Sequence, residues 1–278
     1  MTVDLSVLIP AHNEVGYIEP CLEALLSSED TGAAVEVIVM ANGCTDATAE
    51  IARGYAGRAE TRGWALRVID LPEGGKIGAL NAGDTAATYG AKAFIDADVV
   101  VSPPLLAQLA QVLDSDAPRY ASGIPNVTVS DGGFSAVYTR FWVGIPFLTH
   151  GVPGFGVFAV NAAGRQRWGA FPDIISDDTF VRLQFRPGER HSVPARYDWP
   201  MIEGFGPLVR VRRRQDIGVA EVKALFPALW ANHDAPAPDQ VPLWRRALRD
   251  PLGFAAFAVV ALAVRLPRPG EERWARGR

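Results

Sequence analysis

Short apolar runs alternate with polar, turn-forming segments over the first hundred positions of the chain. Four of these runs are rich in Val and Ile and have the length of buried strands; they are residues 5–10, 35–40, 66–71 and 93–95. The segments between them carry apolar residues at helical spacing, as in 47–55 and 77–89. Strand–helix–strand alternation predicts a mostly parallel sheet with helices on both faces, an α/β fold of the Rossmann-like kind.

The pattern becomes less regular after residue 100. A helix is predicted from the Pro pair at 103–104 to residue 114, and a less regular section that includes 134–147 and the glycine-rich 151–156 follows it. A short, stiff, proline-containing linker is predicted at 234–239. We therefore predict two units, which are residues 1–234 and 235–278.

Polar, glycine-rich or acidic residues follow each of the four predicted strands. They are residues 10–14, 41–46, 73–76 and 96–98. Any one of them could simply cap a helix. Together they predict a ligand site, because the carboxyl ends of parallel strands meet at one edge of the sheet.

Two carboxylates one residue apart, Asp96 and Asp98, follow the fourth strand. Mg²⁺ and Mn²⁺ prefer carboxylate oxygen, usually with substrate phosphate completing the coordination. A second Asp-x-Asp triplet at 114–116 closes a predicted helix and is interpreted as a solvated turn. Position therefore favours the first pair as a divalent-metal and diphosphate site.

Lys76 follows two glycines and opens a predicted helix, which is an arrangement suited to anions. The full P-loop spacing is absent, since Ile77 follows the lysine, so an ATPase is not favoured. Residues 154–159 match G-x-G-x-x-A, but the apolar run after them is typical of a strand. We interpret that match as chance, and a Rossmann dinucleotide site is not predicted.

Several motifs in order resemble the family 2 glycosyltransferases, which have the GT-A fold. They are VLIPAHNE, ANGCTDAT, GGKIGALNAG, FIDADVV, a glycine-rich acceptor segment ending in a basic residue and WGAF, then SDDTFV and an arginine cluster. The resemblance covers roughly residues 4–215. It implies transfer of a sugar from a nucleotide-diphospho-sugar, expected to be UDP-linked, to an acceptor hydroxyl.

The resemblance also implies roles for residues at the first strand ends. Pro10, Asn13 and Glu14 would line the nucleotide pocket. Asn42 would lie near the base. Lys76 would face either the base and ribose or the phosphates.

Further along the chain, the resemblance implies the catalytic and metal-binding groups. Asp98 would bind a Mn²⁺ or Mg²⁺ ion that bridges the diphosphate, and Asp96 would hold the ribose or join the metal network. Asp178, the second acid of the Asp177–Asp178 pair, would be the general base. Two arginines would lie near the leaving diphosphate; they are Arg213 and Arg214.

Three positions depart from the family pattern. Ala41 stands where many members have an aspartate that contacts the base, which leaves the nucleotide open. Asp177 stands where Glu is commoner. Gln215, rather than Trp, follows the arginine cluster and weakens any analogy to processive polysaccharide synthases.

Charge is distributed unevenly along the chain. The net charge is −4, but residues 1–199 carry 14 basic and 23 acidic side chains, whereas residues 200–278 carry 13 and 8. The acidic body argues against a nucleic-acid partner. Two cysteines exclude a disulfide framework and a four-ligand zinc site. The N-terminus has no signal-peptide pattern, so we expect a cytoplasmic protein.

The basic C-terminal segment contains an uncharged apolar run at 251–264, flanked by arginines and tryptophan. As a helix the run reaches about 21 Å, short of a hydrocarbon core of about 30 Å. It is typical of a helix on the surface of an anionic membrane, here the inner face of the cell membrane. A helix that covers the core or a dimer interface is the alternative. A peripheral site would suit a lipid-linked acceptor or one of cell-envelope polysaccharide.

Two other classes compete with a glycosyltransferase. A sugar-nucleotide pyrophosphorylase would share phosphate binding at strand ends, but it should have a glycine-rich, arginine-containing loop after the first strand. A catalytically silent sugar-nucleotide or membrane scaffold would bind the nucleotide without turnover.

Overall fold

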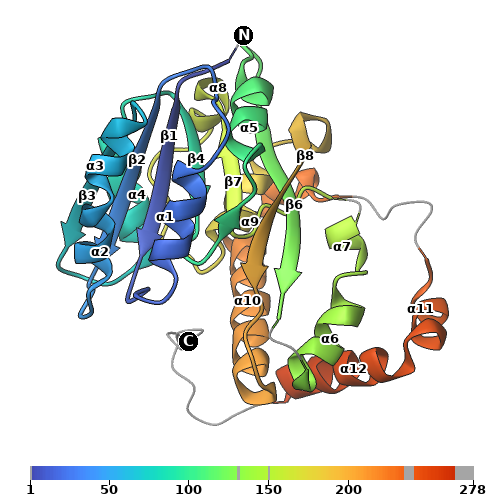
Figure 1. The fold of residues 1–278 in the computed structure, drawn as a ribbon. Helices are drawn as coiled ribbons and strands as arrows, with labels where there is room; N and C mark the ends of the chain where they lie inside the picture. The colour runs from blue at the N-terminus through green and yellow to red at the C-terminus, as the bar shows by residue number, and fades with distance from the viewer. Residues whose placement is uncertain (1, 130–131, 150, 235–240, 267–278) are drawn as a thin grey trace.

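A twisted sheet of eight strands runs through the computed structural model, which describes residues 2–129, 132–149, 151–234 and 241–266 (Figure 1). Across the sheet the order is β3–β2–β1–β4–β7–β6–β8–β5. The strands are β1 (Leu5–Ala11), β2 (Val35–Asn42), β3 (Ala65–Leu71), β4 (Ala91–Ile95), β5 (Val100–Val101), β6 (Tyr120–Thr128), β7 (Val157–Val160) and β8 (Arg190–Pro200).

The first four strands confirm the predicted parallel sheet. β1 pairs in parallel with β2 and β4, and β2 pairs in parallel with β3. Alternate residues of β1 enter different apolar clusters, with Val7 and Ile9 on one face and Leu8 on the other. Both faces of β1 are thus buried, which is why its sequence is a continuous apolar run rather than an alternation.

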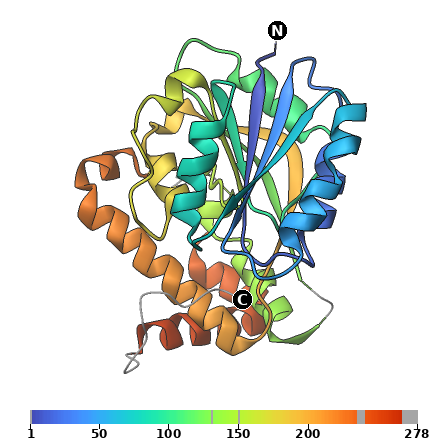
Figure 2. The same cartoon turned by 90° about the vertical axis from the view of Figure 1, so that its left-hand side faces the viewer.

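Helices cover both faces of this half of the sheet (Figures 1 and 2). Leu22 and Leu25 of α1 pack in one cluster, and Ala79 and Leu80 of α4 pack in the other. The helices up to residue 113 are α1 (Ile18–Leu26), α2 (Thr48–Gly54), α3 (Ala56–Thr61), α4 (Lys76–Ala86) and α5 (Leu105–Leu113).

The other half of the sheet has mixed direction. β7 is antiparallel to β4 and β6, β6 and β8 are parallel, and β5 is antiparallel to β8. β7 begins directly after Gly156, which confirms that the glycine pattern there precedes a strand.

The section around 134–147 is more regular than expected, because it forms α6 (Gly133–Trp142) and α7 (Pro146–Thr149). Tyr138, Phe141 and Trp142 are buried at spacings of three and four residues. No polar cap marks the start of α6, which follows Gly132. Burial of its aromatic face, rather than a local start signal, defines this helix.

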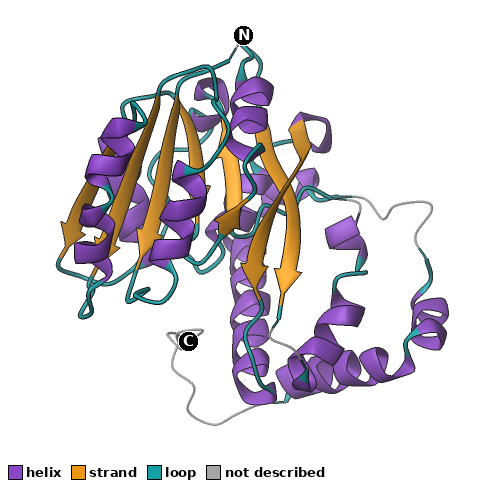
Figure 3. Ribbon diagram, in the orientation of Figure 1, coloured by secondary structure: helices purple, strands orange, loops and turns teal. Residues whose placement is uncertain are grey.

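The C-terminal segment forms the predicted helical appendage, α11 (Leu243–Arg249) and α12 (Pro251–Arg265). It packs against α6 and α10 (Phe205–Leu225), and Figure 3 shows these helices gathered at one end of the molecule. The remaining helices are α8 (Ala162–Arg165), α9 (Asp177–Leu183) and the short 3₁₀ turns η1 (Pro187–Glu189) and η2 (Pro227–Asn232). Within the described residues, no helix combines the length and the apolar character needed to cross a membrane. Residues 235–239 of the predicted linker lie outside the described residues.

Candidate active site

A cleft of about 1280 Å³ opens at the carboxyl ends of β1, β2 and β4. This is the edge of the sheet at which the sequence predicts the ligand site. Of the predicted site residues, ten line the cleft; they are Pro10, Asn13, Glu14, Asn42, Lys76, Asp96, Asp98, Asp177, Asp178 and Arg214.

Asn42, at the end of β2, holds two loops of the cleft together. Its Nδ2 donates to the carbonyl oxygen of Ala11 at 2.8 Å, and its Oδ1 accepts from the backbone N–H of Gly75 at 2.9 Å. The side chain is buried, so its amide is occupied by the protein itself. Asn42 therefore shapes the pocket floor, and a contact with a base would have to come from neighbouring groups.

The turn after β1 has a strained backbone that positions Glu14. Asn13 has φ of 54°, the left-handed region that Asn tolerates better than most residues. Its Oδ1 accepts from the backbone N–H of Thr45 at 2.7 Å, which fastens this turn to the loop after β2. Gly43 in that loop also has positive φ, and a Cβ there would lie 2.6 Å from the backbone nitrogen of Gly74. Only glycine lets the two loops approach this closely.

Lys76, the first residue of α4, lies between two acids: Asp96, which follows β4, and Asp177, which begins α9. Its Nζ is 2.9 Å from Asp96 Oδ1 and 3.3 Å from Asp177 Oδ1. Burial lowers the pKa of Lys76, but the carboxylates of Asp177 and Asp96 outweigh that effect and hold the pKa above its ordinary value. The lysine is therefore charged throughout the neutral range, and it links the Asp-x-Asp motif to the acidic pair of α9.

The two acids of α9 differ in environment. Asp177 is buried, and its Oδ2 has no hydrogen-bond partner among the described residues. Burial and the nearby Asp178 and Asp96 raise its pKa, and Lys76 opposes them. Asp178 is half-buried and lines the cleft, and its Oδ1 accepts a local hydrogen bond from the backbone N–H of Thr179. Of the pair, Asp178 is the carboxylate that a bound substrate can reach.

The donor set at the end of β4 fits a divalent ion that is completed by substrate phosphate. Asp96 and Asp98 both line the cleft, and one oxygen of Asp96 is held by Lys76. No group of three or more His, Cys, Asp or Glu side chains that could hold a metal occurs within the described residues. Mg²⁺ and Mn²⁺ sites at nucleotides need only one or two carboxylates, so Asp96 and Asp98 together suffice.

The arginine cluster of α10 divides between two surfaces. Arg212 and Arg214 line the cleft. Arg213 instead donates to the carbonyl oxygens of Ala263 at 2.9 Å and Leu266 at 3.1 Å, at the C-terminal end of α12. A cation there satisfies carbonyls that the helix leaves unpaired. The sequence motif places the whole cluster, Arg212 included, near the diphosphate, but it does not resolve which of the arginines face the cleft.

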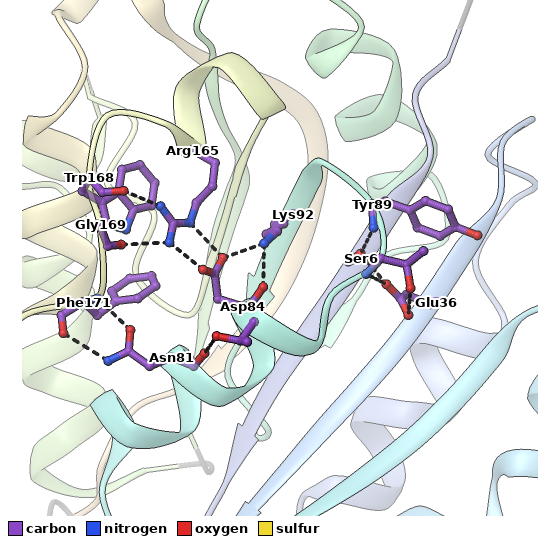
Figure 4. Close-up of polar contacts among 12 residues, drawn as sticks. Ser6, Glu36, Asn81, Asp84, Tyr89, Lys92, Arg165, Trp168, Gly169 and Phe171 are labelled. Atoms are coloured by element: carbon purple, nitrogen blue, oxygen red, sulfur yellow. Dashed lines mark hydrogen bonds and ion pairs between the residues drawn. The ribbon is translucent and has the colours of Figure 1, made fainter.

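A polar network behind the cleft fixes α4, the helix that presents Lys76 (Figure 4). Asp84 of α4 accepts from Arg165 Nη2 at 2.5 Å and from Lys92 Nζ at 2.8 Å. The side chain of Asn81 exchanges two hydrogen bonds with the backbone of Phe171. Arg165 and the WGAF segment, which the resemblance places at the end of the acceptor segment, thus clamp α4 and lie outside the cleft lining formed by the described residues.

Three aromatic side chains of the cleft lining pack together and form an aromatic wall; they are Trp142, Phe155 and Trp199. The ring centroids of Phe155 and Trp199 are 4.9 Å apart, and Trp142 lies 6.1 and 6.2 Å from them. Arg212 lies over Trp142, 5.9 Å from the ring centroid. Sequence reasoning missed this wall because its members come from three separate elements with no shared motif.

The histidines have different positions. His12 lines the cleft, with Nδ1 2.5 Å from the carbonyl oxygen of Asn42. His233 stacks on Trp230, with ring centroids 4.7 Å apart, and lies outside the cleft lining of the described residues. His150 lies outside the described residues.

Comparison with known proteins assigns the chain to a family. Residues 6–161 match the model of glycosyl transferase family 2, more than half of the chain, and the chain belongs to this family. That stretch contains the loops after β1 and β2, the two glycines before Lys76, and both acids after β4.

Curated relatives are similar over shorter stretches. The chain is 34% identical over 107 residues to the uncharacterized glycosyltransferase EpsJ of Bacillus subtilis (strain 168), covering 38% of this chain and 29% of that protein. It is 33% identical over 127 residues to a dolichyl-phosphate beta-glucosyltransferase of Drosophila melanogaster, covering 43% and 38%. It is 37% identical over 98 residues to the 4,4'-diaponeurosporenoate glycosyltransferase of Staphylococcus aureus (strain USA300), covering 34% and 24%. The chain thus spans less than half the length of these relatives.

Solved structures share the fold over nearly the whole chain. One is the mannosyltransferase PcManGT of Pyrobaculum calidifontis, in complex with GDP-Man and Mn²⁺, with a TM-score of 0.60 at 20% sequence identity. The match covers 95% of this chain and 74% of the mannosyltransferase chain. Residues 1–349 of S. aureus TarS, in complex with UDP-GlcNAc, have a TM-score of 0.55 at 16% identity, covering 94% and 81%. These likenesses confirm the GT-A fold.

Proposed function

We propose that the protein transfers a sugar from a nucleotide-diphospho-sugar to an acceptor hydroxyl, with inversion at the anomeric carbon. The observation that carries this proposal is the cleft itself. A family 2 fold brings Asp98, Lys76, Asp178 and Arg214 to one cavity, although they are far apart in the sequence. Similar structures bind GDP-Man or UDP-GlcNAc, and we keep the expectation of a UDP-linked donor.

Divalent metal dependence is part of the proposal. Asp98, with Asp96 beside it, would hold Mn²⁺ or Mg²⁺ against the diphosphate, and a bound ion would offset the charge that develops on the leaving group. The similar mannosyltransferase structure contains Mn²⁺, which supports this assignment.

Asp178 would act as the general base. It takes the proton of the acceptor hydroxyl as that oxygen bonds to the anomeric carbon, and the bond from this carbon to the diphosphate breaks with its electron pair. Arg212 and Arg214 would stabilise the leaving diphosphate electrostatically. With Asp178 as the base and the acceptor oxygen as the attacking nucleophile, the transfer would be a single displacement and would therefore invert the anomeric carbon.

The role of Asp177 is to hold Lys76. Its buried carboxylate cannot approach an acceptor without leaving the ion pair, whereas Asp178 can. Lys76 in turn would face the phosphates, since its ammonium group lies beside the Asp-x-Asp motif.

The acceptor would carry an apolar part, as in a lipid-linked sugar or lipid carrier. The aromatic wall of Trp142, Phe155 and Trp199 supports this, because it offers apolar surface next to Arg212. Two relatives are named for lipid acceptors, dolichyl phosphate and diaponeurosporenoate. Such acceptors are found at membranes, so a peripheral position at the inner face of the cell membrane belongs to the same proposal.

A thermal-shift screen of nucleoside diphosphates and nucleotide sugars, with and without Mn²⁺, tests the donor and the metal together. The true donor should raise Tm by mass action, and only with Mn²⁺ present. Asp98→Asn should remove that shift, while Asp116→Asn, a change in the second Asp-x-Asp triplet, should keep it. A donor shift that is unchanged in Asp98→Asn would refute the metal assignment. Donor binding without transfer to any lipid or sugar acceptor would favour the silent scaffold.

A further inference from the structure

One surface of the C-terminal helices is apolar although it faces solvent. Five residues of α12 and its C-cap are exposed along one stripe of the helix, at spacings of three and four residues; they are Leu252, Ala255, Val259, Leu262 and Leu266. Leu252 is 71% exposed and Leu262 is 62% exposed. The opposite side of α12 is covered, since Ala256 and Val260 are buried against α6 and α10.

α11 continues this surface. Leu243, Trp244 and Leu248 are exposed, the last by 74%, and they alternate with the exposed Arg245 and Arg249. We name the exposed residues of α11 together with the α12 stripe the C-terminal face. A Trp and arginines beside exposed leucines are the composition of helices that lie in the headgroup region of a bilayer.

We infer that the C-terminal face docks the protein on an anionic lipid surface, with α11 and α12 lying in the plane of that surface. This inference deepens the proposed function, because it names the membrane as the partner that brings a lipid acceptor to the cleft. The strands β1, β2 and β4 point toward the end of the molecule that α12 occupies (Figure 1), and residues at the carboxyl ends of these strands line the cleft.

Charge decides between a membrane and a second copy of the chain. Residues 241–266 contain four arginines and a single acid, Asp250, for a net charge of +3. Asp250 is already engaged, because both its oxygens accept from Arg140 and one also accepts from the backbone N–H of Gly253. A second copy would therefore place arginines against arginines, whereas anionic headgroups complement them.

The packing behind the face makes it rigid enough to dock as a unit. Phe254 and Phe257 of α12 pack on Phe141 of α6, with ring centroids 5.6 and 5.3 Å apart. Arg246 turns inward and donates to the carbonyl oxygen of Phe141 at 2.7 Å. The arginines that remain at the surface of α11, Arg245 and Arg249, are thus the ones available to phosphate headgroups.

Co-sedimentation of the full chain with vesicles tests the inference. The vesicles are phosphatidylcholine alone, or phosphatidylcholine and phosphatidylglycerol in equal parts. We expect binding to the mixed vesicles that weakens as salt rises. R245Q/R249Q should weaken that binding about 30-fold, since each arginine near an anionic surface contributes about 1 kcal/mol. L252Q/V259T/L262Q should weaken it about tenfold or more, because the apolar stripe no longer enters the bilayer.

Matched controls change the same residue types elsewhere. R186Q/R196Q removes two exposed arginines near β8, and I217Q/L225Q removes two exposed apolar residues of α10. Both should bind mixed vesicles as the wild type does. Equal loss in the controls, or absence of wild-type binding to mixed vesicles, would overturn the inference. A dimer in light scattering that L252Q/V259T/L262Q dissociates would replace it with self-association.

The thermal shift with donor and Mn²⁺ keeps the two proposals distinguishable. The docking variants leave the cleft untouched, so their donor shift should equal that of the wild type. Vesicle binding without any donor shift would retain the docking face and reject the proposed transferase chemistry. A donor shift without vesicle binding would retain the proposed transferase chemistry and reject the docking face.

Discussion

The donor side of the cleft is built from the carboxyl ends of β1, β2 and β4, whereas the opposite side is built from α6, β8 and α10, with α12 packed behind them. On the donor side, polar contacts join the loops that follow different strands, such as that of Asn42 with Gly75. On the opposite side the contacts are aromatic and join distant elements, such as Trp142 with Trp199.

The difference shows that the two sides of one cavity can be held in place by different kinds of interaction. Turn chemistry and ion pairs fix the donor side locally, so its residues tolerate few replacements. Packing of large rings fixes the opposite side, where several combinations of apolar residues fill the same space. Substitutions should therefore separate donor binding and catalysis from acceptor binding and stability.

The largest effect is expected at the proposed base. Asp178→Asn removes the proton acceptor and should lower kcat by a factor of about 10²–10⁴. Donor binding should persist, because the groups at β4 and α4 are unchanged. Steady-state kinetics with a donor titration check this. A kcat within threefold of wild type would assign the base elsewhere.

The clamp behind α4 should give the next largest effect, on stability. Asp84→Ala leaves Arg165 and Lys92, both largely buried, without their shared carboxylate. Removing one partner of a buried ion pair costs about 3–5 kcal/mol in the free energy of unfolding. Urea denaturation measures this free energy of unfolding. The control is Asp70→Ala, which breaks an exposed ion pair with Arg53 and should change the free energy of unfolding by about 0.5 kcal/mol or less.

Packing behind the aromatic wall should matter less. Phe257→Ala removes a ring that contacts Tyr138 and Phe141, and it should cost about 2 kcal/mol, less than at a fully buried Phe. Because α6 also carries Trp142, the KM for the acceptor should rise while the donor Tm shift stays the same. Ile217→Ala, at an exposed position of α10 outside the C-terminal face, is the control. A change in donor affinity alone would contradict the division of the cleft into two sides.

The smallest effect, on the free energy of unfolding, is expected at Glu189, which lies outside both sides of the cleft. The guanidinium of Arg167, with the backbone N–H of Arg186, lowers the pKa of Glu189 to about 2. A carboxyl with a lowered pKa stabilises the fold above its unfolded-state pKa, and that stability disappears as pH falls through the folded-state value. Glu189→Gln should thus be less stable at neutral pH by about 1 kcal/mol or less. The gap should close between about pH 4.5 and pH 2, and denaturation at several pH values measures it.

Sequence reasoning predicted the donor side well because its signals are local. The short apolar run at residues 93–95, followed by Asp96 and Asp98, indicates both the strand and the chemistry at its end, and the structure places both acids in the cleft. The same holds for Lys76 after its two glycines. Their detailed chemical roles remain proposals.

The opposite side was harder to predict because its signals depend on tertiary packing. α6 has the spacing of a helix, but Gly132 and Gly133 at its start and its aromatic residues fit a loop equally well. Arg212, Arg213 and Arg214 are identical in type, and only the position of the C-terminal end of α12 determines which of them leaves the cleft. No pattern within the cluster carries that information.

Arg213 has a consequence for acceptor length. It fastens the end of α12 to the middle of α10, between the two arginines that face the cleft. With α12 resting on headgroups, the proposed catalytic carboxylate would stand at a constant height above the bilayer. Only hydroxyls that project to that height would be glycosylated. The protein would therefore select acceptors by the distance of the hydroxyl from the bilayer surface, rather than by contacts with each acceptor atom.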